Sequence, residues 1–208
     1  KIVDESTGEE LTGPNQKGVV GIEGPLPPGC MQTVWRDDAR FVNTYWKSIP
    51  GRLLYSTFDW GIRDADGYHF ILGRTDDVIN VAGHRLGTRE IEESIASHPN
   101  IAEVAVVGVA DQLKGQVAMA FAVAKDASGL DSDAARLKLE GEVMKQVDHQ
   151  LGAVARPSRV YFVNVLPKTR SGKLLRRALQ AVAERRDPGD LTTMDDPAAL
   201  QQVKDLVG

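Results

Sequence analysis

The 208-residue sequence contains one cysteine, Cys30. An internal disulfide framework and a cysteine-based zinc site are therefore excluded, and a cytoplasmic protein is expected. No apolar run reaches the roughly 20 residues that span a membrane, and no charged-then-apolar signal segment opens the chain. The formal net charge of −4 lacks the basic surplus that is typical of nucleic-acid binders. We therefore expect a globular protein with neither a membrane nor a nucleic-acid partner.

The chain also lacks an initiator methionine, internal repeats and low-complexity segments. Because it opens on Lys1 in what reads as a strand, we expect a fragment of a longer protein. Hydrophobic residues make up 42% and charged residues 26%, which is ordinary for a globular protein. Neither a serine-nucleophile motif nor a paired-carboxylate arrangement stands out, so the chemistry must be sought in smaller groups.

The pattern of apolar residues changes after Gly73. Residues 1–73 read as β-rich, with a hairpin at Asp66–Gly67 and a short helix that packs Phe41, Tyr45 and Trp46. The remainder predicts a small α+β domain with a sheet of about three strands covered by helices. We expect the boundary between residues 1–75 and 76–208, in a charged segment that ends at Asp77. The predicted elements after it are a hairpin over 78–84, strands at 102–109, 117–124 and 159–165, and helices at 89–97, capped by Thr88, at 132–150, at 172–186 and from Pro197.

One basic loop, Pro-Lys-Thr-Arg-Ser-Gly-Lys at residues 167–173, precedes the third of these helices. Ser171 is predicted to cap that helix, which would place Lys173 at its start, where amide groups and the lysine charge both favour an anion. The spacing is not that of a Walker loop. A phosphate-binding loop and a solvated basic loop both fit the residues.

Three other groups carry polar side chains beside glycines. Asp59 follows an apolar strand and precedes Gly61, so its carboxylate can accept hydrogen bonds from a vicinal diol such as ribose, although an Asp in a turn looks the same. Arg74 can bind a phosphate or a sugar hydroxyl, or form an exposed ion pair. Arg85 lies between Gly83 and Gly87 and offers a forked donor to an anion, or sits on a surface turn.

The sequence supplies no metal site. His84 has no second histidine, cysteine or aspartate at metal-ligand spacing, so we reject a metal site there.

In their order along the chain, these groups resemble the C-terminal third of an acyl-CoA synthetase of the adenylate-forming superfamily. The similarity is carried by residues 58–59, 73–88 and 167–173 and extends over nearly the whole chain. The short-chain branch, acetyl-CoA and propionyl-CoA synthetases, is most similar, and residues 25–35 look more like the propionyl enzymes. The resemblance implies that residues 1–75 are a β-rich end of a large N-terminal AMP-binding domain. Residues 76–208 would then be a mobile C-terminal domain.

Such enzymes use ATP to convert a short-chain carboxylate to acyl-AMP, and then transfer the acyl group to CoA. The resemblance implies Mg²⁺ as well, held mainly by the N-terminal domain that the chain lacks. It implies adenylation by Lys173, nucleotide contacts from Asp59, Ile71 and Arg74, a hinge at Asp76, a phosphate contact from Arg85, and a pantetheine tunnel at Gly83. It also implies reversible acylation of Lys173 by a lysine acyltransferase and a deacylase. The fragment alone is predicted to be inactive.

One position departs from the family pattern. In acetyl-CoA synthetases an arginine that helps to hold CoA lies where this chain has Asp148, so the CoA phosphate contact is in doubt and Lys145 is a candidate substitute. Other interpretations are an acetate-CoA ligase, a luciferase-like or amino-acid-activating relative, and a non-catalytic binding module that kept the fold. Acyl-chain specificity and oligomeric state have no signal in these residues.

Overall fold

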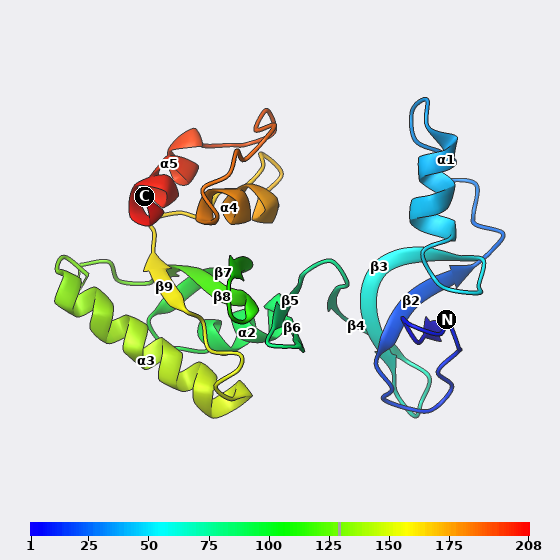
Figure 1. Ribbon diagram of the computed structural model, residues 1–208, viewed down its shortest axis with the longest axis horizontal. Coiled ribbons are helices and arrows are strands. Elements are labelled where there is room, and N and C mark those ends of the chain that lie inside the picture. Colours follow the sequence, from blue (N-terminus) through cyan, green and yellow to red (C-terminus); the bar gives the residue numbers. More distant parts are fainter. Residues whose placement is uncertain (129) are drawn as a thin grey trace. The chain divides into compact units, whose positions relative to one another are not determined.

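The computed structural model describes residues 1–128 and 130–208, which form two compact units, Lys1–Asp76 and Asp77–Gly208 (Figure 1). Each unit contains its own sheet and is described by itself. The boundary expected from the sequence lies between residues 75 and 76. Within the described residues, no helix is both long and apolar enough to cross a membrane.

The first unit is built on an antiparallel four-stranded sheet in the order β1-β2-β3-β4. Its strands are β1 (Ile2–Val3), β2 (Gly18–Glu23), β3 (Leu54–Arg63) and β4 (His69–Arg74). The predicted hairpin at Asp66–Gly67 joins β3 to β4. Gly67 has φ +90°, and the Asp64 carboxylate accepts the Tyr68 N–H at 2.8 Å. A glycine is needed there because left-handed backbone is costly for other residues.

A short helical segment packs aromatic side chains in this first unit. Helix α1 (Asp38–Phe41) is capped by Asp37 and continues into the π-helical turn η1 (Val42–Trp46). The Tyr45 and Tyr55 rings stack with centroids 5.4 Å apart, and the Trp46 ring meets the Tyr55 ring edge-on. The predicted packing role of these aromatic residues is therefore confirmed.

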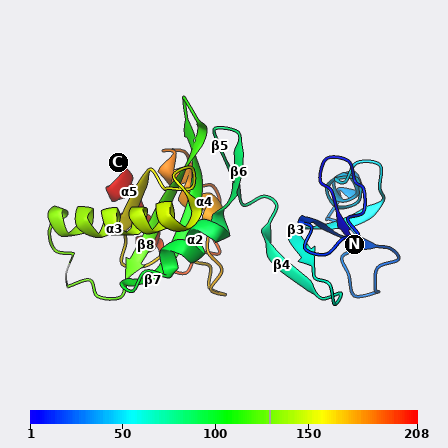
Figure 2. The same ribbon diagram turned by 90° about the horizontal axis from the view of Figure 1, so that it is seen from below.

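The second unit has a five-stranded sheet in the order β6-β5-β8-β7, with β9 also paired to β8. Its strands are β5 (Val78–Val81), β6 (His84–Gly87), β7 (Ile101–Asp111), β8 (Gly115–Ala124) and β9 (Arg159–Phe162). The α+β class is confirmed. The sheet is wider than the roughly three strands predicted, because the β5–β6 hairpin joins it through a Val81–Gly115 bridge. The tip of the β7–β8 hairpin reaches the end of β5 (Figure 2).

Four helices cover the two faces of this sheet. They are α2 (Thr88–Ala96), α3 (Asp133–Leu151), α4 (Arg176–Ala183) and α5 (Pro197–Val207). Along β7 the side chains alternate: Val106 belongs to a core with α2 and α3, whereas Ala105 and Val107 belong to a core with α4 and α5. This period of two explains why β7 is apolar on both faces. In Figure 1 the strands accordingly lie between α3 and the α4–α5 pair.

The predicted helix ends are partly right. The Ser132 hydroxyl accepts the Ala135 N–H and caps α3, and Gly152 ends it with φ +83°. The predicted Thr88 cap is wrong, because α2 already includes Thr88, which is buried, and the N-cap is Gly87. Thr88 instead donates its backbone N–H to the Asp77 carbonyl at 3.1 Å, which ties the start of α2 to the start of the unit.

Candidate functional site

Lys173 lies in a loop before α4, not at its start. The prediction that Ser171 caps the helix is wrong: α4 begins at Arg176, its N-cap is Leu175, and no side chain caps it. The Thr169 N–H donates to the Lys173 carbonyl at 2.8 Å, and the Thr169 hydroxyl accepts the Lys173 N–H at 3.1 Å. Gly172 turns the chain with φ +82°. Attraction of an anion therefore depends on the exposed Lys173 ammonium group, because its backbone N–H is already used.

Two other segments of the second unit hold this loop. The Lys168 ammonium lies 2.6 Å from the Glu103 carboxylate of β7. On the other side, the Arg170 N–H donates to the Thr193 carbonyl at 3.1 Å, and the Asp195 N–H donates to the Lys168 carbonyl at 3.0 Å. The segment between α4 and α5 thus forms a strap along the loop. Lys173 projects from a well-anchored turn.

The β5–β6 hairpin turns on Ala82 and Gly83, whose φ angles are +49° and +86°. Two consecutive left-handed residues make a type I′ turn, which matches the twist of the flanking strands. The Ala82 N–H donates to the Lys114 carbonyl at 2.8 Å, which anchors the turn to the tip of the β7–β8 hairpin. A Cβ atom added at Gly83 would have no neighbour within 4 Å. The space on the side where a Gly83 side chain would lie is therefore open for a ligand to approach closely.

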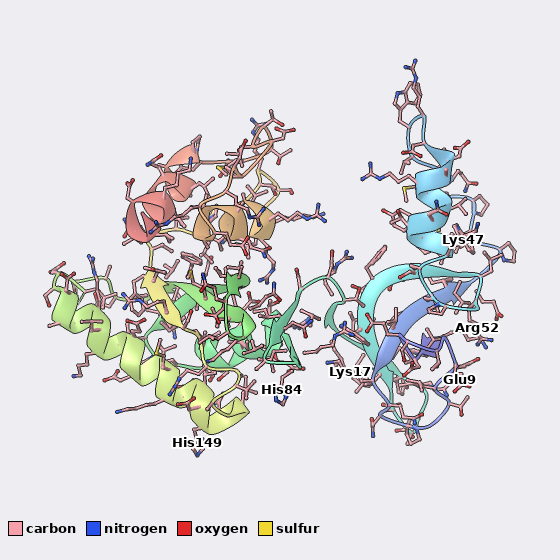
Figure 3. All side chains as sticks on the ribbon, in the orientation of Figure 1. Glu9, Lys17, Lys47, Arg52, His84 and His149 are labelled. Carbon is pink, nitrogen blue, oxygen red and sulfur yellow. The ribbon has the colours of Figure 1, made fainter. Side chains whose placement is uncertain are left out.

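Arg85 and His84 follow this turn on β6. Arg85 is exposed and lies opposite Asn80 in the hairpin register. His84 is also exposed and projects away from the sheet (Figure 3). Over the described ranges 1–128 and 130–208, no group of three or more histidine, cysteine, aspartate or glutamate residues can hold a metal ion.

Asp59 and Arg74 lie opposite each other on β3 and β4 of the first unit. An Arg74 nitrogen is 3.9 Å from the Asp59 carboxylate, and the fork of Arg74 bonds both Asp76 oxygens at 2.9 and 3.2 Å. The guanidinium also lies 5.7 Å from the Phe58 ring centroid. Phe58 adopts φ +59°, which is rare for a non-glycine residue and common beside functional groups.

Three of the four predicted residues of the first unit, Asp59, Arg74 and Asp76, therefore form one cluster. The fourth, Ile71 of β4, has a half-exposed side chain. The other three predicted residues, Gly83, Arg85 and Lys173, belong to the second unit.

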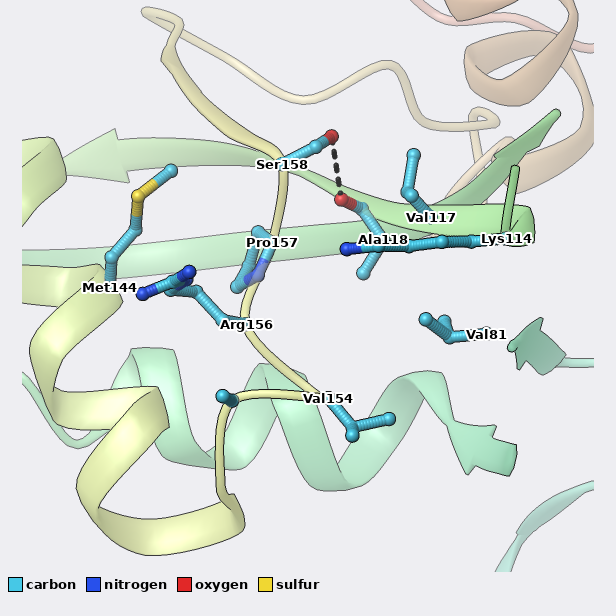
Figure 4. Close-up of a pocket in the computed structure, with 10 residues that line it drawn as sticks. Val81, Lys114, Val117, Ala118, Met144, Val154, Arg156, Pro157 and Ser158 are labelled. Atoms are coloured by element: carbon cyan, nitrogen blue, oxygen red, sulfur yellow. Dashed lines mark hydrogen bonds between the residues drawn. The ribbon is translucent and has the colours of Figure 1, made fainter. Parts of the chain in front are cut away.

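A cavity of about 270 Å³ lies beside Val81, the last residue of β5 before the Gly83 turn (Figure 4). It is lined by Val81, Lys114, Val117, Ala118, Met144, Ala153, Val154, Arg156, Pro157 and Ser158. The cavity presents two cationic side chains, Lys114 and Arg156. Arg156 also donates to the Asp148 carboxylate at 2.9 Å, so the acidic residue at the position in doubt is neutralised by a neighbouring arginine.

Residues 90–173 match the family model described as the AMP-binding enzyme C-terminal domain. The second unit of this chain belongs to that family. Lys173 is the last residue of the match, and the Gly83 hairpin and the Asp59 cluster lie before it.

The whole chain is 64% identical over 208 residues to the propionate–CoA ligase of Salmonella typhimurium, covering 100% of this chain and 33% of the relative. The acetyl-coenzyme A synthetase of Pyrobaculum aerophilum is 44% identical over 191 residues, which is 92% of this chain and 27% of the relative. The ATP-bound structure of MatB from Rhodopseudomonas palustris aligns with a TM-score of 0.72 and 27% identity, over 88% of this chain and 33% of that one. The chain thus spans about a third of the length of these proteins.

Sequence reasoning missed both cationic residues that line this cavity, Lys114 and Arg156. Lys145, the candidate substitute, is exposed and is not among the residues that line the cavity. The partner of Arg156 is Asp148, which lies eight residues earlier, within α3, whereas Arg156 follows the end of that helix. Such a pair matches no helical spacing, and the only signal in the sequence was the unusual acidic residue itself.

Proposed function

We propose that this chain is the C-terminal part of an ATP-dependent propionate–CoA ligase. The observation that carries the proposal is the 64% identity to the Salmonella propionate–CoA ligase, which extends over all 208 residues. The activity belongs to the full-length protein, because the chain spans only 33% of that relative. We expect these residues alone to catalyse neither half-reaction.

In the first half-reaction, a propionate oxygen attacks the α-phosphate of ATP, which gives propionyl-AMP and releases pyrophosphate. Lys173 suits this step because an exposed ammonium group on a flexible stem can approach the negative charge that develops between carboxylate and phosphate. The Thr169 turn and the strap at residues 193–195 fix where the stem begins. The position of Lys173 relative to the bound nucleotide would then depend on how the second unit as a whole is oriented.

In the second half-reaction, the CoA thiolate attacks the acyl carbon of propionyl-AMP, forming propionyl-CoA and releasing AMP. The Gly83 turn suits the passage of a thin pantetheine arm, because Gly83 has no side chain and the space beside it is open. Arg85, exposed on the adjoining strand, would offer a forked donor to a nucleotide phosphate. The hinge at Asp76 would exchange the Lys173 loop for this hairpin between the two steps.

The nucleotide itself would be held partly by the first unit. The Asp59 carboxylate, 28% exposed, can accept both ribose hydroxyls, with Arg74 beside it and Ile71 as an apolar surface for the adenine. Mg²⁺ would be held mainly by the N-terminal part of the full-length enzyme, as the resemblance implies. Lys173 is exposed, so a lysine acyltransferase can reach it, and acylation would remove the charge that adenylation uses.

An acetate–CoA ligase is the second candidate, favoured by the 44% identity to the Pyrobaculum enzyme. A non-catalytic module that has kept the fold is a third. ATP–pyrophosphate exchange with different acids separates the three candidates. A propionate–CoA ligase should exchange faster with propionate than with acetate, an acetate–CoA ligase faster with acetate, and a non-catalytic module with neither.

The decisive variant is Lys173→Ala in the full-length protein. We expect ATP–pyrophosphate exchange with propionate to fall about 100- to 1,000-fold, the loss typical of removing one transition-state donor. Conversion of supplied propionyl-AMP and CoA to propionyl-CoA should continue. Lys204→Ala, an exposed lysine on α5, is the matched control and should alter neither rate. Undiminished exchange in Lys173→Ala would remove the loop from the mechanism.

A further inference from the structure

Arg176, the first residue of α4, lies three positions after Lys173 and connects four parts of the second unit. Its guanidinium forms a forked pair with Glu92 of α2, in which one of the two bonds measures 2.7 Å. It donates to the Val106 carbonyl of β7 at 3.0 Å, and its Nε lies 3.5 Å from the Asp77 carboxylate. The Glu92 carboxylate in turn accepts the Val106 N–H at 2.8 Å. Every partner of this arginine thus lies in a different element.

A cation at this position needs a specific reason. The N-terminus of a helix carries partial positive charge, so an arginine there is disfavoured unless anions surround it. Burial by itself would lower the pKa of Arg176. The hydrogen-bonded Glu92 carboxylate and the charge of Asp77 outweigh that effect and raise the pKa above its usual value. The two carboxylates therefore compensate the charge of the guanidinium and orient it at the end of the Lys173 loop.

Arg176 also sets the register of α4 on β7. Three side chains on one stripe of α4 bond every second residue of β7. The pairs are Arg176 with Val106 at 3.0 Å, Gln180 with Gly108 at 2.8 Å and Glu184 with Ala110 at 3.0 Å. Four helical residues rise about 6 Å and two strand residues about 6.8 Å, so the two ladders match over this length. A slip of α4 by one residue would break all three, and Lys173 moves with α4.

The same arginine reaches the start of the unit. Asp77 is the first residue after the boundary, and its carbonyl accepts the Thr88 N–H at 3.1 Å. Its carboxylate faces Arg176. Asp77 is thereby fixed to α2 and to α4, so that rotation of the unit is confined to the backbone before it.

We propose that Arg176 is the positioning residue for Lys173: it locks the Lys173 loop, through Glu92 and Asp77, to the residue at which the unit begins to turn. This inference rests on the proposed function. When the second unit is positioned for adenylation, these contacts fix the position of the Lys173 loop relative to Asp77. The Gly83 hairpin is anchored through Lys114 instead, so thioester formation does not depend on this lock.

The test uses Arg176→Ala, Arg176→Lys and Glu92→Gln in the full-length protein, with Arg177→Ala as the matched control. Arg177 is the next residue and is exposed. For Arg176→Ala we expect kcat for ATP–pyrophosphate exchange to fall about 10- to 100-fold, as for a catalytic group displaced by up to 1 Å. KM for ATP and the rate of thioester formation from supplied propionyl-AMP should stay within about twofold of wild type. Arg176→Lys keeps the charge without the fork and should recover part of the loss.

A residue that only stabilises the fold would give another pattern. Equal losses in both half-reactions, in step with a lowered melting temperature, would overturn the proposal, as would unchanged exchange in Arg176→Ala. If Arg176→Ala does not fold, the same split in Arg176→Lys and Glu92→Gln decides. Absence of exchange and thioester formation in the wild-type protein would refute the proposed function itself and is distinguishable from every result with the variants.

Discussion

Substitution of Gly83 by leucine tests the second half-reaction with little effect on the fold. Gly83 has φ +86°, so any side chain there costs about 1–2 kcal/mol from the left-handed backbone. The Cβ atom itself adds no steric cost, because it would have no neighbour within 4 Å. We therefore expect Gly83→Leu to fold, with a modest loss of stability.

The effect on catalysis should be far larger. If the pantetheine arm passes over the Gly83 turn, a leucine side chain would obstruct it, and we expect the rate of propionyl-CoA formation from propionyl-AMP and CoA to fall about 100-fold. ATP–pyrophosphate exchange should remain within about twofold of wild type, because it needs no CoA. Gly83→Ala has a smaller side chain, so its rate of propionyl-CoA formation should lie between those of wild type and Gly83→Leu.

The first unit provides a matched control. Gly67 has φ +90°, also lies at the tip of a hairpin, and also has open space around an added Cβ atom. Gly67→Leu should therefore carry the same conformational cost without loss of either half-reaction. If the two leucine variants lose thioester formation equally, or if Gly83→Leu retains it, the assignment of the Gly83 turn to the CoA path is refuted.

Two further substitutions test charged pairs of the second unit. Arg156→Ala should raise KM for CoA about tenfold, which is equivalent to about 1.4 kcal/mol, and should raise it more than Lys145→Ala does. Steady-state kinetics with varied CoA compare the two variants, and a larger rise in Lys145→Ala would favour Lys145 as the CoA contact. Glu140→Ala should lower the unfolding free energy by about 1.5–3 kcal/mol in urea titrations, because the buried Glu140 carboxylate accepts the Val160 N–H at 2.9 Å; an unchanged midpoint would contradict this.

Elements with a complete local signal could be predicted from the sequence. Helix α3 is an example: it spans Asp133–Leu151, close to the predicted 132–150, with Ser132 as its cap and Gly152 at its end. The β3–β4 hairpin was equally predictable from its Asp-Gly turn. In both cases the residues that decide the structure lie within a few positions of each other.

Elements decided by competition or by distant partners could not be predicted. Ser171 is a residue type that commonly caps helices, but Thr169 forms hydrogen bonds with the backbone N–H and carbonyl of Lys173, and the helix begins only at Arg176. Thr88 fails as a cap because its side chain is buried and its N–H is used by the Asp77 carbonyl. Local patterns cannot rank such alternatives, because the winning contact depends on the tertiary fold.

The Arg176–Glu92 pair shows the same limit over a longer range. The two residues are 84 positions apart. In the sequence, Arg176 is one of two adjacent arginines, Arg176 and Arg177, which look alike. Only the packing of α4 on β7 separates a partly buried, doubly paired guanidinium from an exposed one.

Under the proposed function, the order of the strands explains why one small unit would serve two reactions only by turning. The Gly83 hairpin is formed by β5 and β6, at one end of the strand order, whereas the Lys173 loop is fastened to β7 at the other end. Both are anchored by backbone hydrogen bonds, so neither can travel the width of the sheet as a loose loop. A nucleotide held in one place can therefore meet Lys173 and Gly83 in turn only if the sheet rotates with both. The forked Arg74–Asp76 pair and the Arg176–Asp77 pair lie on either side of the unit boundary, so we expect such a rotation to take place in the backbone between Asp76 and Asp77.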